Sequence, residues 1–201
     1  MRLQSFLSIG LAVLFAGSAP SLFPQAVPAA RQGGLPLVVG AGFSDYSLDW
    51  GEGRRMAGPT VWVDWNFWNL SRLPSLLRGF GIEAEGHDIN YAHPSSLPTM
   101  RQDTGEGGAI YTLRRYRLIH PYAKFLAGIG SIDFPDSTNP AYTHDTRDVL
   151  SPGGGVEYHA YRQLWVRGDY EYQFWRHIFG PNDLNPQGFT IGVSYNFWHG
   201  Q

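Results

Sequence analysis

The feature that most constrains this chain is an alternation of apolar and polar side chains, with a period of two, that begins near residue 35. The clearest run extends from Phe189 to Phe197, where every second side chain is aromatic or aliphatic and the others are Thr, Gly, Ser and Asn. Side chains of a β-strand point alternately to its two faces, so this pattern predicts a strand whose faces meet different surroundings.

Seven further segments alternate in the same way, so we expect eight strands in all. They lie at residues 37–44, 60–67, 80–87, 108–114, 122–130, 154–160 and 164–174. No crossover helix is expected between them. Ser71–Arg78 has room for one helical turn at most, because Pro74 interrupts it.

The connections between these strands alternate in length. Long polar links rich in Pro, Asp, Asn and Gly are expected at residues 46–58, 88–105, 131–149 and 175–187. Shorter links are expected near residues 69–78, 115–120 and 161–163. Long loops at one end and short turns at the other are typical of a membrane barrel. The sequence predicts an all-β fold: a single eight-stranded antiparallel up-and-down transmembrane β-barrel.

Aromatic residues favour this membrane barrel over a soluble one, in which the apolar faces would point inward. If the first strand runs outward, aromatic side chains gather at the short-turn ends of the strands, and Trp and Tyr concentrate at membrane interfaces. The mean hydropathy of the chain is only −0.25, because the apolar side chains that face lipid are averaged with polar side chains that face the interior. The predicted girdle consists of Phe67, Trp68, Phe80, Tyr116, Tyr122, Tyr158, Tyr161, Trp165, Phe197 and Trp198.

The first thirty residues have the layout of a secretory signal peptide. Arg2 precedes a mostly apolar run over 6–17, and small residues follow. Cleavage after Ser18 and cleavage after Ala29 both fit, and no cysteine is present for a lipid anchor. We therefore expect a signal and processing region at 1–30 and a barrel domain at 31–201, with no peptidoglycan-binding domain after it. The expected location is the bacterial outer membrane, reached through a cleaved signal peptide.

The last strand carries a recognisable pattern, Thr190-x-Gly192-x-x-Tyr195-x-Phe197. With the strands before it, this segment resembles the C-terminal assembly signal of the eight-stranded outer-membrane barrels of the outer-membrane protein A and opacity-protein type. The resemblance implies insertion by the barrel-assembly machinery, and the outward apolar faces are expected to contact outer-membrane lipids. The external loops are expected to face an extracellular partner of unknown identity.

The polar faces of the strands predict a charged interior. An eight-stranded barrel is just wide enough for side chains to fill it, so these charges are expected to pair as a plug, with an ion path as the alternative. We expect Glu157 to pair with Lys124 or Arg167, and inward glycines such as Gly40 and Gly130 to leave room for larger neighbours. The predicted network consists of Asp64, Glu83, Glu85, Arg114, Lys124, Glu157, His159, Arg167, Asp169 and Glu171.

Several function classes find little support in the sequence. The absence of cysteine excludes disulfides, a thiol nucleophile and thiolate zinc sites, and a net charge of −2 argues against nucleic-acid binding. His93 and Ser95 lie together only in a loop, and His144, Asp145 and Asp148 match no calcium-loop spacing. We therefore expect no catalytic, cofactor or metal site.

The sequence thus predicts a non-enzymatic barrel with a structural or surface-interaction role and four external loops. Loop aromatics such as Tyr91, Phe134 and Phe179 either contact partners or pack on the barrel rim. A narrow channel for ions or small solutes and a lipid-modifying enzyme remain the alternatives.

Overall fold

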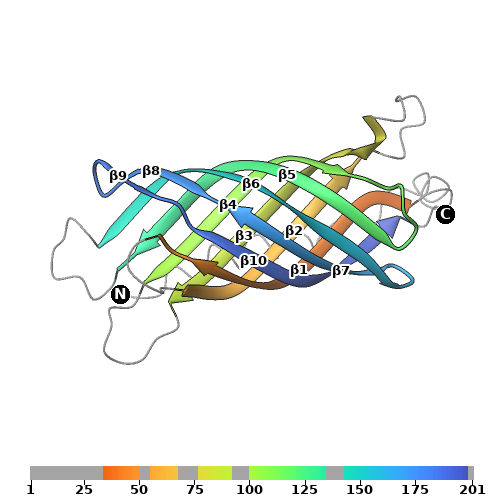
Figure 1. The fold of residues 1–201 in the computed structure, drawn as a ribbon, viewed down its shortest axis with the longest axis horizontal. Coiled ribbons are helices and arrows are strands. Elements are labelled where there is room, and N and C mark those ends of the chain that lie inside the picture. The colour runs from red at the N-terminus through yellow and green to blue at the C-terminus, as the bar shows by residue number, and fades with distance from the viewer. Residues whose placement is uncertain (1–33, 50–54, 68–76, 92–99, 135–142, 199–201) are drawn as a thin grey trace, which may run out of the picture. The chain divides into compact units, whose positions relative to one another are not determined.

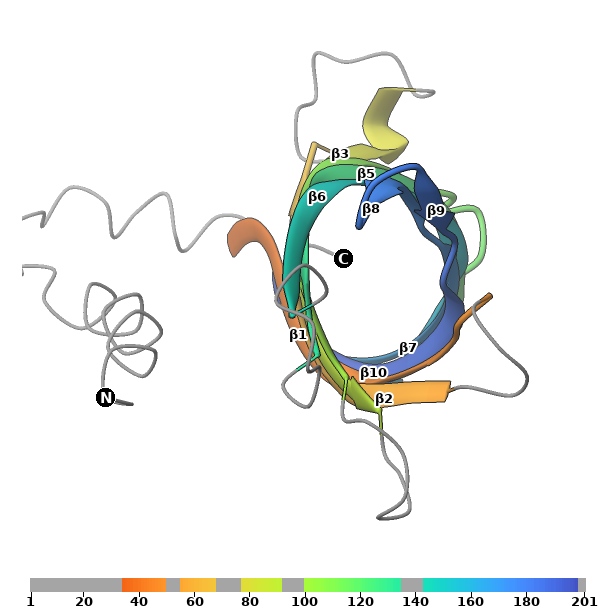
Figure 2. The same ribbon diagram turned by 90° about the vertical axis from the view of Figure 1, so that its left-hand side faces the viewer.

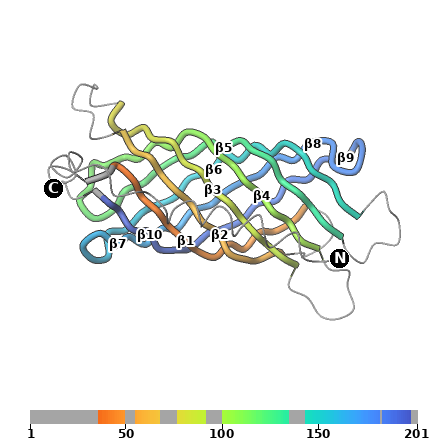
Figure 3. Tube along the Cα trace, turned by 180° about the vertical axis from the view of Figure 1, so that it is seen from behind, coloured from red at the N-terminus to blue at the C-terminus, as the bar shows by residue number. Residues whose placement is uncertain are grey.

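The computed structural model describes residues 34–49, 55–67, 77–91, 100–134 and 143–198, and these residues form a closed antiparallel β-barrel. Figure 1 shows the strands inclined to the long axis, Figure 2 shows the ring that they form, and Figure 3 shows them from behind. Eight strands close this ring: β1 (Gly34–Ser47), β2 (Arg55–Asn66), β3 (Phe80–Tyr91), β4 (Arg101–Thr112), β5 (Ile119–Asp133), β6 (His144–Tyr161), β7 (Leu164–Tyr172) and β10 (Gln187–Trp198).

Each barrel strand pairs with its neighbour in the chain, and β1 pairs with β10 to close the ring. The predicted eight-stranded barrel is therefore confirmed. Within the part of the chain that the structure describes, no helix is long and apolar enough to cross a membrane. A 3₁₀ turn, η1 (Leu77–Gly79), precedes β3.

A short hairpin, β8 (Phe174–Ile178) and β9 (Asn182–Leu184), follows β7 and was not expected from the sequence. β8 pairs with β6 through Trp175 opposite Val149, and β9 pairs with β8. The backbone reverses through positive φ angles of 58° at His177, 48° at Phe179 and 110° at Gly180. The predicted loop at 175–187 is thus wrong, because much of it is paired strand.

The strands also extend further than predicted at the end where β1 meets β2, called here the loop end. β4 begins at Arg101 and β6 at His144, inside the links predicted at 88–105 and 131–149. Conversely, the connection between β2 and β3 covers 67–79, so the predicted alternation of link lengths is weaker than expected. The opposite end, called the turn end, contains the tight connection at Arg162–Gln163 predicted at 161–163.

Charged pairs on the outer surface explain why the hydropathy pattern did not predict these strand extensions. Arg55 Nη2 lies 2.7 Å from Asp45 Oδ2, and Arg101 Nη2 lies 3.1 Å from Asp88 Oδ2. Charged side chains take the place of the apolar ones here, so the alternation in hydropathy ends although the backbone ladder continues. Ladder hydrogen bonds satisfy the backbone whatever the side chains are.

The middle of the barrel is apolar outside and polar inside. Ile191 is 68% exposed and Phe189 58% exposed, whereas Lys124, Arg167 and Glu171 are buried. Such an inverted arrangement matches a barrel surrounded by lipid.

The predicted aromatic girdle is correct only in part. Phe80, Tyr116, Tyr158, Tyr161 and Phe197 are exposed on the outside. Tyr122 and Trp165 instead turn inward: Tyr122 donates to Asp169, and Trp165 stacks on His120. Trp68 lies outside the described residues, and so does the side chain of Trp198.

An apolar cluster fills the interior at the loop end, where the β8–β9 hairpin folds in. Tyr91, Phe134 and Phe179 pack against it, which favours rim packing for these aromatics over partner contact. The apolar plug, as this cluster is called below, consists of Tyr46, Leu48, Met56, Ile89, Met100, Ile132, Val149, Trp175, Ile178 and Leu184.

Candidate functional site in the barrel interior

Lys124 on β5 is one of two cationic centres below the apolar plug. Its Nζ forms a short contact with Glu85 Oε2 and lies 2.8 Å from Glu171 Oε2. Glu83 and Asp169 follow at 3.5 and 3.8 Å. Four carboxylates from two other strands thus converge on one ammonium group, which ties β3, β5 and β7 together across the interior.

Arg167 on β7 is the second centre. Two of its nitrogens donate to the two oxygens of Glu83, both at 2.9 Å, and Nε donates to Asp169 at 2.8 Å. The guanidinium also lies 4.7 Å from the ring centroids of Trp62 and Tyr122. The bidentate hydrogen bonds to Glu83 and the two flanking aromatic rings fix the position of the guanidinium group.

Glycine makes room for the large aromatic side chains beside these charges. A Cβ on Gly40 would overlap the Trp62 ring, and one on Gly130 would overlap Trp175. Both Trp62 and Trp175 are almost completely buried. The expectation that inward glycines accommodate larger neighbours is therefore confirmed at these two positions, and the interior is filled rather than hollow there.

A chain of hydrogen bonds connects the charged centres to the apolar plug. Tyr46 donates to Glu171 Oε1 at 2.9 Å, and so does the amide of Gln173. The Gln173 carbonyl accepts from Gln102 and from Trp175 Nε1, both at 3.0 Å. These hydrogen bonds therefore link the apolar plug directly to the charged layer.

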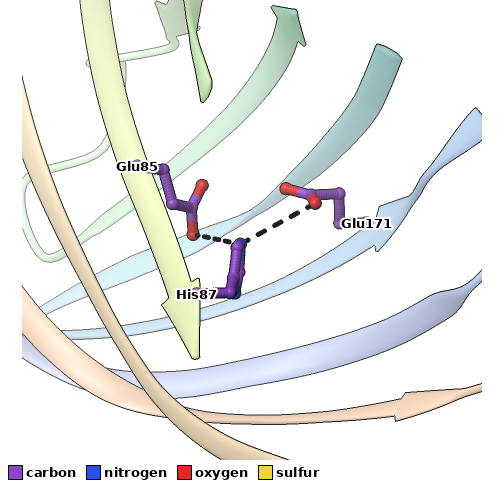
Figure 4. A group of neighbouring side chains, drawn as sticks. All are labelled: Glu85, His87 and Glu171. Atoms are coloured by element: carbon purple, nitrogen blue, oxygen red, sulfur yellow. Dashed lines mark ion pairs between the residues drawn. The ribbon is translucent and has the colours of Figure 1, made fainter. Parts of the chain in front are cut away.

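A hydroxyl cluster lies beside the charged centres, where Ser44 on β1 and Thr60 on β2 surround the Nδ1 face of His87 on β3. Thr60 Oγ1 lies 2.9 Å and Ser44 Oγ 3.4 Å from His87 Nδ1, and Ser44 also bonds Thr190 Oγ1 at 2.7 Å. On the other side of the ring, His87 Nε2 lies 3.5 Å from Glu85 Oε1 and 3.9 Å from Glu171 Oε1 (Figure 4).

The structure places the predicted network residues on the inner face of the barrel. Arg114 and His159 are half-buried, and His159 contacts the Arg162 carbonyl near the turn end. The predicted pairing of Glu157 does not describe the close ion pairs, since those of Lys124 and Arg167 within 4 Å involve other carboxylates. The buried members are Asp64, Glu83, Glu85, Lys124, Glu157, Arg167, Asp169 and Glu171.

Sequence reasoning missed several interior polar residues. Gln102 lies in the part of β4 that was predicted as a loop, and Glu106 lies between that loop and the strand predicted from 108. Gln102, Thr104 and Glu106 nevertheless alternate with the outward side chains. Extending the polar face without requiring apolar neighbours would have found them. Gln173 follows the polar face of the strand predicted at 164–174, whereas its hydrogen bond with Trp175 depends on the unexpected hairpin.

Among the described residues, those considered for chemistry from the sequence do not assemble into a site. His144 lies 2.5 Å from Asp133, and Asp145 pairs with Arg147 on its own strand. Although burial acts to raise it, hydrogen bonds from the Phe179 N–H and from Arg147 hold the pKa of Asp145 below its usual value. His93 and Ser95 lie outside the described residues.

The proposed assembly-signal residues occupy both faces of β10. Thr190 points inward to Ser44, and Gly192 packs against the backbone of Ala41 and Gly42. Tyr195 and Phe197 lie on the outside with ring centroids 4.8 Å apart.

Comparison with known proteins agrees with this architecture. Residues 9–197 match the family model described as the outer membrane protein beta-barrel domain. No curated protein matches the sequence significantly.

Several solved structures share the fold at low sequence identity. Neisserial surface protein A is 14% identical over 83% of this chain and 100% of its own, with a TM-score of 0.65. Ail, the attachment invasion locus protein of Yersinia pestis, is 13% identical over 80% of this chain and 97% of its own, with a TM-score of 0.56. The N-terminal barrel domain of Pseudomonas aeruginosa OprF is 14% identical over 83% of this chain and 100% of its own, at 0.50. The chain therefore belongs to the family of outer membrane protein β-barrel domains, and it is a bacterial outer-membrane β-barrel.

Proposed function

We propose that this protein is a closed, non-enzymatic barrel that acts as a rigid scaffold for chain segments displayed at the cell surface. The observation that carries the proposal is the filled interior: the apolar plug lies across the loop end, and the Lys124 and Arg167 centres span the layer below it. A bore occupied by side chains from facing strands supports a structural role rather than conduction.

The similar structures support a surface role for the loop end. One of them is named as a surface protein and another as an attachment invasion locus protein. By analogy, we place the partner-binding elements of this chain in the connections at 48–54, 92–100 and 134–143, which leave the scaffold at the same end. Variation in such connections changes recognition without disturbing the barrel.

Lipid-modifying chemistry is disfavoured by the position of the hydroxyl groups. Ser44, Thr60 and His87 resemble part of a hydrolase constellation, but all three are buried inside the barrel. An acyl chain in the membrane meets the outer face, so these hydroxyls are beyond its reach.

The proposal is tested by reconstituting the folded barrel into planar lipid bilayers. Because both layers fill the bore, we expect no defined single-channel steps. Boiled protein serves as the control for detergent artefacts. Reproducible, ion-selective steps from the folded protein alone would contradict the proposal and favour the narrow channel.

A further inference from the structure

Three metal-ligating side chains converge in the charged layer, from two different strands. Glu85 and His87 follow one another on the inner face of β3, and Glu171 reaches across from β7 (Figure 4). One ligand atom from each lies within 4.8 Å of the others. All three side chains are almost completely buried.

The imidazole of His87 is held in place by one nitrogen and leaves the other available. Nδ1 lies 2.9 Å from Thr60 Oγ1, whereas Nε2 is buried without a hydrogen-bond partner among the described residues. This Nε2 points between the two glutamates (Figure 4). Metal-bound histidines are typically fixed in this way, with the second ring nitrogen bonded to a neighbouring group.

The two glutamates divide their oxygens between two sides. On one side, Oε2 of Glu85 and Oε2 of Glu171 both contact Lys124 Nζ. On the other side, Oε1 of each faces His87 Nε2, at 3.5 and 3.9 Å. Glu171 Oε1 also accepts hydrogen bonds from Tyr46 and from the Gln173 amide, both at 2.9 Å. Glu85 Oε1 has no hydrogen-bond partner among the described residues. Lys124 therefore orients both carboxylates without occupying the space between their Oε1 atoms and His87.

The barrel interior carries an excess of negative charge, which a bound cation would reduce. The carboxylates exceed the three cations Arg114, Lys124 and Arg167 by four within the described residues. Unpaired charge away from water is costly, so the excess requires protons or bound cations. The buried carboxylates are the seven residues Asp64, Glu83, Glu85, Glu106, Glu157, Asp169 and Glu171.

We propose that Glu85, His87 and Glu171 form a binding site for a divalent transition-metal ion, with zinc as the best fit. One imidazole nitrogen and two carboxylate oxygens are ligands that zinc accepts at about 2.0–2.2 Å. Tetrahedral ligands at that distance are roughly 3.4 Å apart, close to the 3.5 Å between His87 Nε2 and Glu85 Oε1. Rotation of the Glu171 carboxylate brings in the third ligand. The ion would tie β3 to β7 across the closed barrel.

Metal content of the refolded protein tests the proposal. The barrel is refolded in detergent with micromolar zinc and dialysed against metal-free buffer, and the retained zinc is measured by plasma mass spectrometry. We expect one zinc per chain for the wild type and for His159→Gln, which removes an interior imidazole outside the cluster. His87→Gln should bind zinc at least tenfold more weakly. Loss of zinc from the wild type, or equal retention by His87→Gln, would overturn the proposal.

Copper replaces zinc in a second measurement that needs only the wild type. Electron paramagnetic resonance of the Cu²⁺-loaded barrel should show hyperfine coupling to a single nitrogen, as one imidazole and two carboxylates require. A spectrum without nitrogen coupling, or with several coupled nitrogens, would refute the assignment.

Folding of each variant is checked by its faster migration on gels before boiling. If His87→Gln does not fold, the isosteric Glu171→Gln takes its place with the same expectation of weakened zinc binding. If neither variant folds, the copper spectrum of the wild type decides alone.

Discussion

At the scale of single residues, Arg167 shows how an ion pair can be held inside a barrel. Its guanidinium is forked onto Glu83, bonded to Asp169 and enclosed by the rings of Trp62 and Tyr122. Removing one partner of such a buried group leaves the others desolvated and uncompensated, which costs more than the pair itself contributes.

Replacing Arg167 by alanine should therefore destabilise the folded barrel by about 3–5 kcal/mol. Arg176→Ala, in the exposed part of β8, is the matched control and should change stability by less than about 0.5 kcal/mol. Urea unfolding in detergent, followed by intrinsic fluorescence, gives both midpoints. Equal midpoints for the two variants would show that the charged centre does not stabilise the barrel.

At the scale of elements, the sequence was informative where side-chain alternation and strand pairing coincide. The segment from Phe189 to Phe197 was recognised because its outward residues are apolar. β4 was recognised only from residue 108, since Arg101 and Asp103 face outward where apolar residues were sought. The β8–β9 hairpin has no such period, because it contributes Trp175 and Ile178 to the plug through a reversal at positive φ. The network members followed from alternation, but their partners depend on distances across the bore.

Two adjacent side chains of β8, Phe174 and Trp175, point in opposite directions and should differ in their contribution to stability. Trp175 is fully buried in the apolar plug, whereas Phe174 is 39% exposed on the outside. Trp175→Ala should cost about 3–5 kcal/mol, because it leaves a cavity opposite Gly130. Phe174→Ala should cost less. The same urea titration compares them, and a larger loss for Phe174→Ala would mean that the hairpin does not seal the interior.

At the scale of the whole molecule, the barrel joins two layers of different chemistry within one closed ring. The apolar plug lies at the loop end, and the ion-pair layer continues beneath it through Gln173 and Tyr46. An outer surface of apolar side chains suits lipid, while loop variation at one end suits recognition. The central claim is that the interior between these layers is closed to solvent.

Thiol labelling tests this claim directly, because the chain has no cysteine and any introduced thiol is unique. Ser151 is fully buried inside the barrel, and Thr146 on the same strand is exposed. A charged, water-soluble thiol reagent should modify Thr146→Cys rapidly and should leave Ser151→Cys unmodified until the barrel is unfolded. Modification of Ser151→Cys in the folded barrel at a rate comparable to Thr146→Cys would contradict a closed interior.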